Sequence, residues 1–241
     1  MRLVIPIIVA LTLTATFAHA NHIDFIQDDS DLSNNGGVAT NATFSLSTGG
    51  AAVMNTQIGE PADILGGTRA VTLLQDGFGG TISATKAAGT DFIDVVAGNV
   101  ATGILTLDYA AFENSDFDTN WDAIAIEFAL LDNIVGDGEL DVFLTVESSA
   151  GTGTATSGRL EDSVNGNAFT FFFNFSDPAF ASVDFSDVDR VTAVFDTAIL
   201  GTDFRIGSIT RESLVPEPAA IVLVLGGVSV VLLGRRRISK R

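Results

Sequence analysis

The sequence predicts an all-β protein: a single antiparallel β-sandwich, jelly-roll-like, at residues 21–213, between a signal peptide at 1–20 and a transmembrane helix within 214–241. Three observations lead to this prediction. Short runs of β-branched and aromatic residues alternate with polar residues at a period of two, which is typical of half-buried strands. Gly, Asp, Asn and Ser separate these runs, as expected for turns. An uncharged apolar stretch lies near each end of the chain.

The first 20 residues have the three parts of a secretory signal peptide. Arg2 precedes an apolar stretch at 3–13, and a small-x-small triplet follows at 18–20. Signal peptides end at such a triplet, so we expect the mature chain to begin near Asn21. A retained membrane anchor is the alternative, which the short apolar stretch and the triplet disfavour.

The clearest strand is at 121–130, where every second residue is apolar: Ile124, Ile126, Phe128 and Leu130. Alternate side chains of a strand point to opposite faces, so these four should face the core. Similar patterns predict further strands at 42–46, 70–74, 80–85, 92–96, 100–109, 140–147, 169–175, 188–195 and 204–209.

The connections between strands are predicted from their turn residues. We expect 188–195 and 204–209 to form a closing pair joined by a turn at 200–202. Glycines within the acidic segment 132–141 favour a hairpin turn there. The Thr, Gly and Ser residues at 150–158 suggest a flexible loop.

The number of strands and the lack of a long helical pattern favour a sandwich over a β-solenoid. A solenoid would need a short repeat of fixed length. The sequence Gly-Thr-Asp-Phe recurs only once, at 89–92 and 201–204, so we interpret the two copies as similar turns that lead into strands.

The apolar run at 219–234 holds 16 residues without charge. As a helix it would be about 24 Å long, slightly short of a hydrocarbon core of about 30 Å, so local thinning would help it to span. Five cations follow it, and basic residues beside a span stay cytoplasmic. We therefore expect a precursor anchored in the inner membrane, with its N-terminus and its domain outside. A buried core helix is the alternative.

Two prolines precede this run, at Pro216 and Pro218, with Glu217 between them. Each proline keeps the preceding residue out of helical geometry, so the segment should be extended and accessible to an enzyme. The tail resembles the PEP-CTERM sorting signal of Gram-negative bacteria. The resemblance covers about the last 26 residues and consists of Pro216, Glu217, Pro218, the apolar helix and Arg235, Arg236 and Arg237.

That resemblance implies a partner and a destination. Members are recognised by a membrane-embedded exosortase and cut near the Pro-Glu-Pro motif. They are then released or attached at the cell surface, often in bacteria that make exopolysaccharide. The resemblance implies nothing about the domain between the two terminal segments.

The domain itself is strongly acidic. Without the terminal segments, residues 21–215 keep 6 of the 12 Lys and Arg and 29 of the 30 Asp and Glu, a net charge of −23. Such a surface repels nucleic acid and anionic lipid, so both are excluded as partners. Divalent cations and neutral polysaccharide remain as candidate partners. Only Tyr109 and Trp121 could serve as the Tyr or Trp platforms on which sugars stack.

The residues needed for nucleophilic catalysis are scarce, so we expect no catalytic residues and no enzyme. There is no cysteine, His19 lies in the signal peptide, and His22 lies at an N-terminus that we expect to be loose. Lys86 is the only lysine of the domain. These residues cannot form a Ser-His-Asp or Cys-His triad.

The best candidate for a metal site is a calcium loop with oxygen side chains at alternate positions. Glu127 stands where a twelve-position loop places its bidentate acid, although Trp121 replaces the usual glycine. A solvated acidic loop is the alternative. The candidate ligands are Asp116, Asp118, Asn120, Asp122 and Glu127, and a weaker second group is Asp132, Asp137, Glu139 and Asp141.

We therefore expect an exported β-sandwich with a binding or structural role at the cell surface or in the extracellular matrix, sorted by an exosortase. Two alternatives remain. One is a Ca²⁺-dependent carbohydrate-binding or adhesion module. The other is a glycan-active enzyme that uses two close carboxylates, one of them with a raised pKa.

Overall fold

The computed structural model describes residues 22–26, 33–34, 43–58, 64–77, 79–87, 90–110, 112, 115–133, 139–161, 168–197 and 200–214. The predicted signal peptide at 1–20 and the predicted sorting tail with Pro216, Glu217, Pro218 and Arg235 to Arg237 lie outside these residues. Within the described ranges, no helix is long and apolar enough to cross a membrane.

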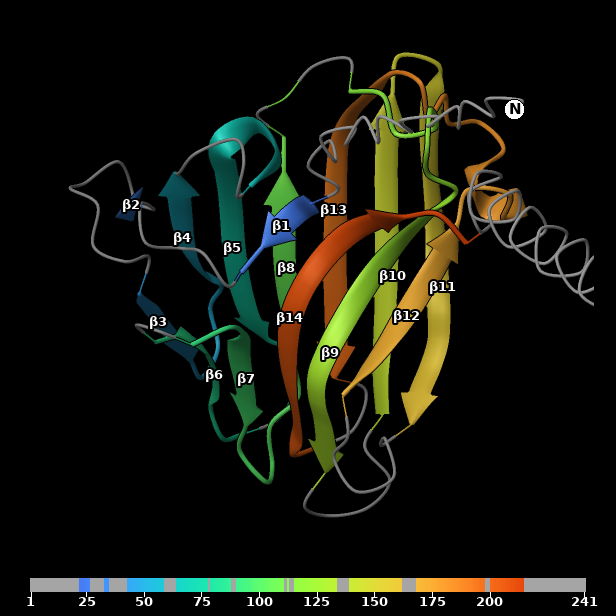
Figure 1. Ribbon diagram of the computed structural model, residues 1–241. Helices are drawn as coiled ribbons and strands as arrows, with labels where there is room; N and C mark the ends of the chain where they lie inside the picture. The colour runs from blue at the N-terminus through green and yellow to red at the C-terminus, as the bar shows by residue number, and fades with distance from the viewer. Residues whose placement is uncertain are drawn as a thin grey trace, which may run out of the picture.

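The described residues form two antiparallel sheets that face each other, which confirms the predicted all-β sandwich (Figure 1). Each sheet has seven strands. Sheet A runs in the order β12 (Phe169–Asn174), β9 (Ala123–Asn133), β14 (Thr202–Glu212), β7 (Ile93–Ala97), β6 (Ile82–Lys86) and β3 (Phe44–Thr48), with β1 (His22–Phe25) paired to β14. Sheet B runs in the order β11 (Gly151–Glu161), β10 (Glu139–Ser148), β13 (Val188–Thr197), β8 (Gly103–Tyr109), β5 (Thr68–Gln75), β4 (Val53–Ile58) and β2 (Ser33–Asn34). Two short 3₁₀ turns, η1 (Leu65–Gly67) and η2 (Pro178–Phe180), complete these elements.

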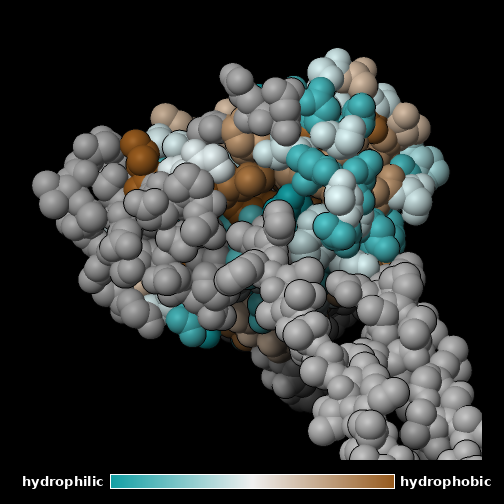
Figure 2. Space-filling model, turned by 45° about the horizontal axis from the view of Figure 1, so that its top comes forward, coloured by the Kyte–Doolittle hydropathy of each residue, from teal (hydrophilic) through white to brown (hydrophobic). Residues whose placement is uncertain are grey.

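The core lies between the sheets and is filled by every second side chain of each strand. Phe195 of sheet B contacts Phe128 and Phe204 of sheet A, with ring centroids 6.0 and 5.7 Å apart. The apolar faces predicted for 140–147 and 169–175 both turn inward. Figure 2 shows the outside of one end, where hydrophobic residues are visible in a recess between hydrophilic ones.

A buried ion pair joins the N-terminal strand to sheet B. Arg69 Nη1 of β5 lies 2.7 and 2.6 Å from the two carboxylate oxygens of Asp24 in β1. Tyr109 of β8 donates to Asp24 Oδ2 at 2.5 Å, and Arg69 Nε donates to Gln57 of β4 at 2.7 Å. All four residues are 0% exposed. The prediction of a loose N-terminus is therefore wrong, because His22 begins a strand that is fixed through Asp24.

Two predicted turns connect different sheets. The predicted partners at 188–195 and 204–209 are β13 and β14, which lie in sheets B and A. The turn itself is present, since Gly201 has a φ of 74°. Likewise β9 and β10, on either side of 134–138, lie in opposite sheets, so this connection is no hairpin. Alternation predicts which face of a strand is buried but does not identify the neighbouring strand.

The segment predicted as a loop at 150–158 is instead the first part of β11, from Gly151 onward. Its outward residues are threonines, while its inward residues include Gly153 and Ala155, so the apolar half of the alternation is weak. Small residues are required there: a Cβ on Gly153 would lie 2.7 Å from the carbonyl oxygen of Ala179 in η2. Close packing against η2 thus explains a composition that is otherwise typical of a loop.

Candidate binding face on sheet B

The outer face of sheet B carries two rows of side chains that cross six strands. In each row the residues are direct register partners from β11 through β10, β13, β8 and β5 to β4. The first row is Thr154, Thr145, Thr192, Asp108, Ala70 and Thr56, and the second is Thr156, Phe143, Val194, Thr106, Thr72 and Met54. We call these two rows the neutral lane, because they contain seven threonines and a single ionisable residue.

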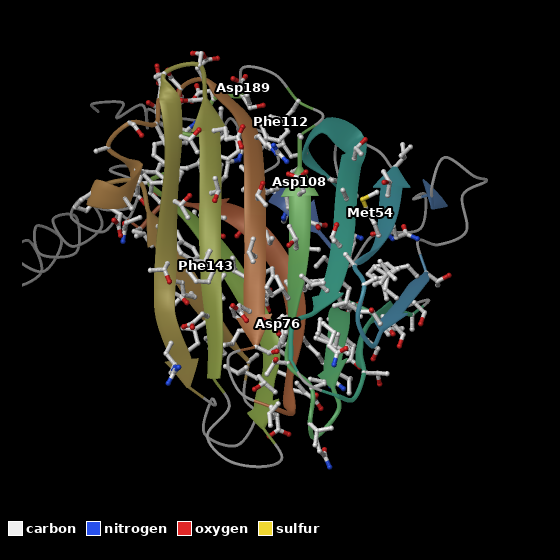
Figure 3. All side chains as sticks on the ribbon, turned by 180° about the vertical axis from the view of Figure 1, so that it is seen from behind. Met54, Asp76, Asp108, Phe112, Phe143 and Asp189 are labelled. Atoms are coloured by element: carbon white, nitrogen blue, oxygen red, sulfur yellow. The ribbon has the colours of Figure 1, made fainter. Side chains whose placement is uncertain are left out.

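The lane is long in one direction only. Neighbouring strands are about 4.8 Å apart, so six strands span about 24 Å, whereas the two rows are about 7 Å apart along each strand. Figure 3 shows Phe143, Asp108 and Met54 spread in this order across the face, from β10 to β4. Met54, at the end of the lane, is 67% exposed.

The one charge in the lane, Asp108, is balanced from the neighbouring row. Arg190 of β13 donates from Nε and Nη2 to the two carboxylate oxygens of Asp108, at 2.8 and 3.0 Å. Thr192 Oγ1 also donates to Asp108, at 2.9 Å. The hydrogen bond and charge of Asp108 raise the pKa of Arg190. A two-point pair of this kind holds both side chains in fixed positions and leaves no net charge in the lane.

Charged residues border the lane on both sides over β11, β10 and β13. On one side Asp141 stands directly opposite Arg159 of β11 and Asp196 of β13, and Asp76 lies just beyond the end of β5. On the other side Glu147 stands opposite Arg190, with 3.5 Å between Oε1 and Nη1. Burial raises the pKa of Asp196, and the charges of Asp76 and Asp141 raise it further. Like charges placed directly opposite each other destabilise a sheet, so the pair Asp141 and Asp196 lowers the stability of the folded protein.

We expect Asp196→Asn to stabilise the protein at pH 7 by about 0.5 kcal/mol, the scale of one cross-strand pair. The pKa of Asp196 is raised above its ordinary value of 3.8, so the folded state holds this proton more tightly than the unfolded state. Stability therefore falls as the pH rises from 3.8 through the raised pKa. Urea unfolding at pH 7 and pH 3 tests this: the gain should be absent at pH 3, and an equal gain at both values would contradict it.

The aromatic residues expected as sugar platforms are placed elsewhere. Tyr109 is fully buried and bonds Asp24. Trp121 is half-buried, with the guanidinium of Arg211 5.8 Å from its ring centroid. The aromatic residue in the lane is Phe143, between Thr156 and Val194. The alternation of β10 indicated that Phe143 points outward, but its neighbours depend on strand order and register.

The structure does not bring the acids of the predicted calcium loop together. Asp116 Oδ1 accepts backbone hydrogen bonds from Asp118 and Thr119, both at 3.0 Å, so it stabilises its own turn. Asp122 Oδ1 accepts from the backbone of Leu214 at 2.7 Å, and Glu127 of β9 accepts from Ser208 at 3.1 Å. Asn120 is exposed.

The other candidate acids, Asp118 and the described members of the second group, are not brought together as metal ligands either. The pKa of Asp118 is raised by its burial, by its hydrogen bond with Asp116 and by the charges of Asp116 and Asp184. In the second candidate group, Asp132 is exposed near the end of β9, while Asp141 faces Asp196 on sheet B; Asp137 lies outside the described residues. Among the described residues, no three His, Cys, Asp or Glu side chains come together as metal ligands would.

Comparison with known proteins assigns no family. No protein-family model matches the chain, and no curated protein sequence matches it. Among solved structures, a non-crystalline cellulose specific carbohydrate-binding module, CBM28, has 12% identity and a TM-score of 0.39 over 55% of this chain and 80% of that one. A family 11 carbohydrate-binding module from Clostridium thermocellum, in complex with a β-1,3-1,4-mixed-linked tetrasaccharide, has 14% identity and a TM-score of 0.33 over 74% of this chain and 92% of that one. An agarase has 9% identity and a TM-score of 0.40, and the match covers 61% of this chain and 23% of the agarase chain.

Proposed function

We propose that the chain is an exported binding protein whose neutral lane on sheet B holds an extended polysaccharide. One observation carries this proposal. In a domain with a net charge of −23, the lane crosses six strands without an unbalanced charge. Acids elsewhere keep the surface solvated, so a face without them is available to a ligand that carries no charge.

The side chains of the lane suit the two kinds of surface that a sugar presents. Threonine hydroxyls both donate and accept hydrogen bonds, as sugar hydroxyls do. Phe143, Val194 and Met54 offer apolar surface to the C–H faces of a sugar ring. Threonine and valine are stiff at χ1, so little side-chain entropy is lost on binding.

Phe143→Ala is expected to weaken polysaccharide binding about tenfold, because it removes the one aromatic ring of the lane and a large aromatic side chain contributes more than its neighbours. Affinity electrophoresis in native gels that contain neutral polysaccharides measures this. The matched control is Phe172→Ala, which removes a 42% exposed phenylalanine from the outer face of sheet A. Equal retardation of wild type and of Phe143→Ala, or equal losses in the two variants, would contradict the assignment to sheet B.

A second candidate, a glycan-active enzyme, is favoured by the pair Asp141 and Asp196. Their carboxylates are cross-strand neighbours beside the lane, and the pKa of Asp196 is raised. A retaining glycosidase uses two carboxylates about 5 Å apart, one of them protonated. Release of reducing ends from the bound polymer by the wild type would favour this candidate. Binding that is lost in EDTA and restored by Ca²⁺ would favour the calcium-dependent module.

The place of action follows from the terminal segments and stays part of the proposal. We propose that residues 1–20 direct export and that the tail at 214–241 anchors the precursor until an exosortase-type enzyme acts near Pro216, Glu217 and Pro218. A neutral exopolysaccharide outside the cell is then the natural ligand for the lane.

A further inference from the structure

We infer that the polymer bound by the neutral lane is free of carboxylate and sulfate groups and lies across the strands of sheet B. This inference rests on the proposed function and adds the charge class of the ligand and its direction. It follows from where the charges of the outer face lie relative to the lane.

Over β10 and β13, the charged borders of the lane exclude the other direction. A polymer that ran along β13 would pass from the lane over Asp196 at one end and Arg190 at the other. Along β10 it would pass over Asp141 and Glu147. On these two strands only about 7 Å separates the two neutral rows, which is too short for an extended polymer. Across the strands, the path of about 24 Å from Thr156 to Met54 meets no bordering residue.

The same borders select against acidic polymers. A carboxylate in the lane would lie about one row from Asp141, Asp196 and Arg159, and this border, with two acids against one cation, repels it. It would also compete with Asp108 for Arg190, whose guanidinium is already held at two points. Sugar hydroxyls can instead accept from Arg190 and donate to Asp108 without separating the pair. Asp108, with Arg190 at the edge of the lane, therefore offers polar contacts to neutral sugars.

The ends of the lane allow a matched test with four exposed positions. Thr156→Glu and Met54→Glu place a charge at the two ends of the second row, on β11 and β4. Thr152→Glu and Ile58→Glu place the same charge on the same two strands but in the bordering row beyond the lane. Because all four side chains are exposed, each variant should fold.

The probes are neutral β-glucan, xylan, mannan and agarose, followed by the carboxymethylated form of whichever binds. We expect wild type to bind the carboxymethylated form at least about tenfold more weakly, and each end variant to lose about fivefold on the neutral form, roughly one lost favourable contact. The two control variants should stay within about twofold of wild type.

Each contrary result overturns a different statement. Equal binding of the neutral and carboxymethylated forms would overturn the charge class. If the end variants bind as well as their controls while Phe143→Ala still binds weakly, the polymer does not lie across the strands. The assignment of binding to the outer face of sheet B would then still hold. If wild type binds no neutral polysaccharide at all, the proposed function itself fails.

Discussion

Asp24→Ala is expected to lower the free energy of unfolding by about 3–5 kcal/mol, the cost of removing one partner from a buried ion pair. The variant leaves the guanidinium of Arg69 fully buried against Gln57, without its carboxylate partner. It also removes the acceptor of the Tyr109 hydroxyl. Urea unfolding followed by tryptophan fluorescence measures the loss through the midpoint concentration.

Two further variants separate the loss of the buried ion pair from the effect of removing any acidic side chain. Asp91→Ala removes an exposed acid and should change stability by no more than about 0.5 kcal/mol. Asp24→Leu combined with Arg69→Met removes both charges and should be more stable than Asp24→Ala alone, because no buried charge is left unpaired. An Asp24→Ala variant as stable as Asp91→Ala would show that β1 does not fix the N-terminus.

The sequence is sufficient to predict strands and their buried faces, because alternation is a local property. The strands β5, β8, β9, β10, β12, β13 and β14 lie where apolar residues recur at every second position. One detail differs in β9, where the predicted inward residue Leu130 is half-buried and Leu131 is buried. The cause is a shift of register against β14 near Arg205.

Strands with little alternating apolar content escape such prediction. β1 is short, and its decisive residue, Asp24, is charged; only the fold shows that Arg69 lies opposite it. In β4 the inward positions are Val53, Asn55 and Gln57, so two of the three are polar. Burial of polar residues requires partners, and here the partner of Gln57 comes from another strand.

The candidate face was beyond sequence analysis for a different reason. Each strand shows that its threonines point outward, but the lane exists only because six strands from distant parts of the chain align in one register. Asp108 and Arg190 are 82 residues apart in sequence. Their pairing follows from the neighbouring positions of β8 and β13 in sheet B.

Phe195→Ala should have an effect as large as that of Asp24→Ala. Phe195 is 0% exposed and lies where the two sheets meet, against Phe128 and Phe204. Truncation of a buried phenylalanine costs about 3–5 kcal/mol, because apolar burial is lost and a cavity remains. The same urea titration measures it, with Phe172→Ala as the exposed control of the same residue type.

Phe195→Leu adds a second comparison, since it keeps most of the apolar volume and should lose clearly less than Phe195→Ala. Phe195 is adjacent in β13 to Val194, whose side chain lies in the lane on the opposite face of the sheet. A loss of stability without a loss of polysaccharide affinity, measured below the unfolding transition, would show that the core and the lane are independent. If Phe195→Ala lost no more stability than Phe172→Ala, the two sheets would not be held together at this point.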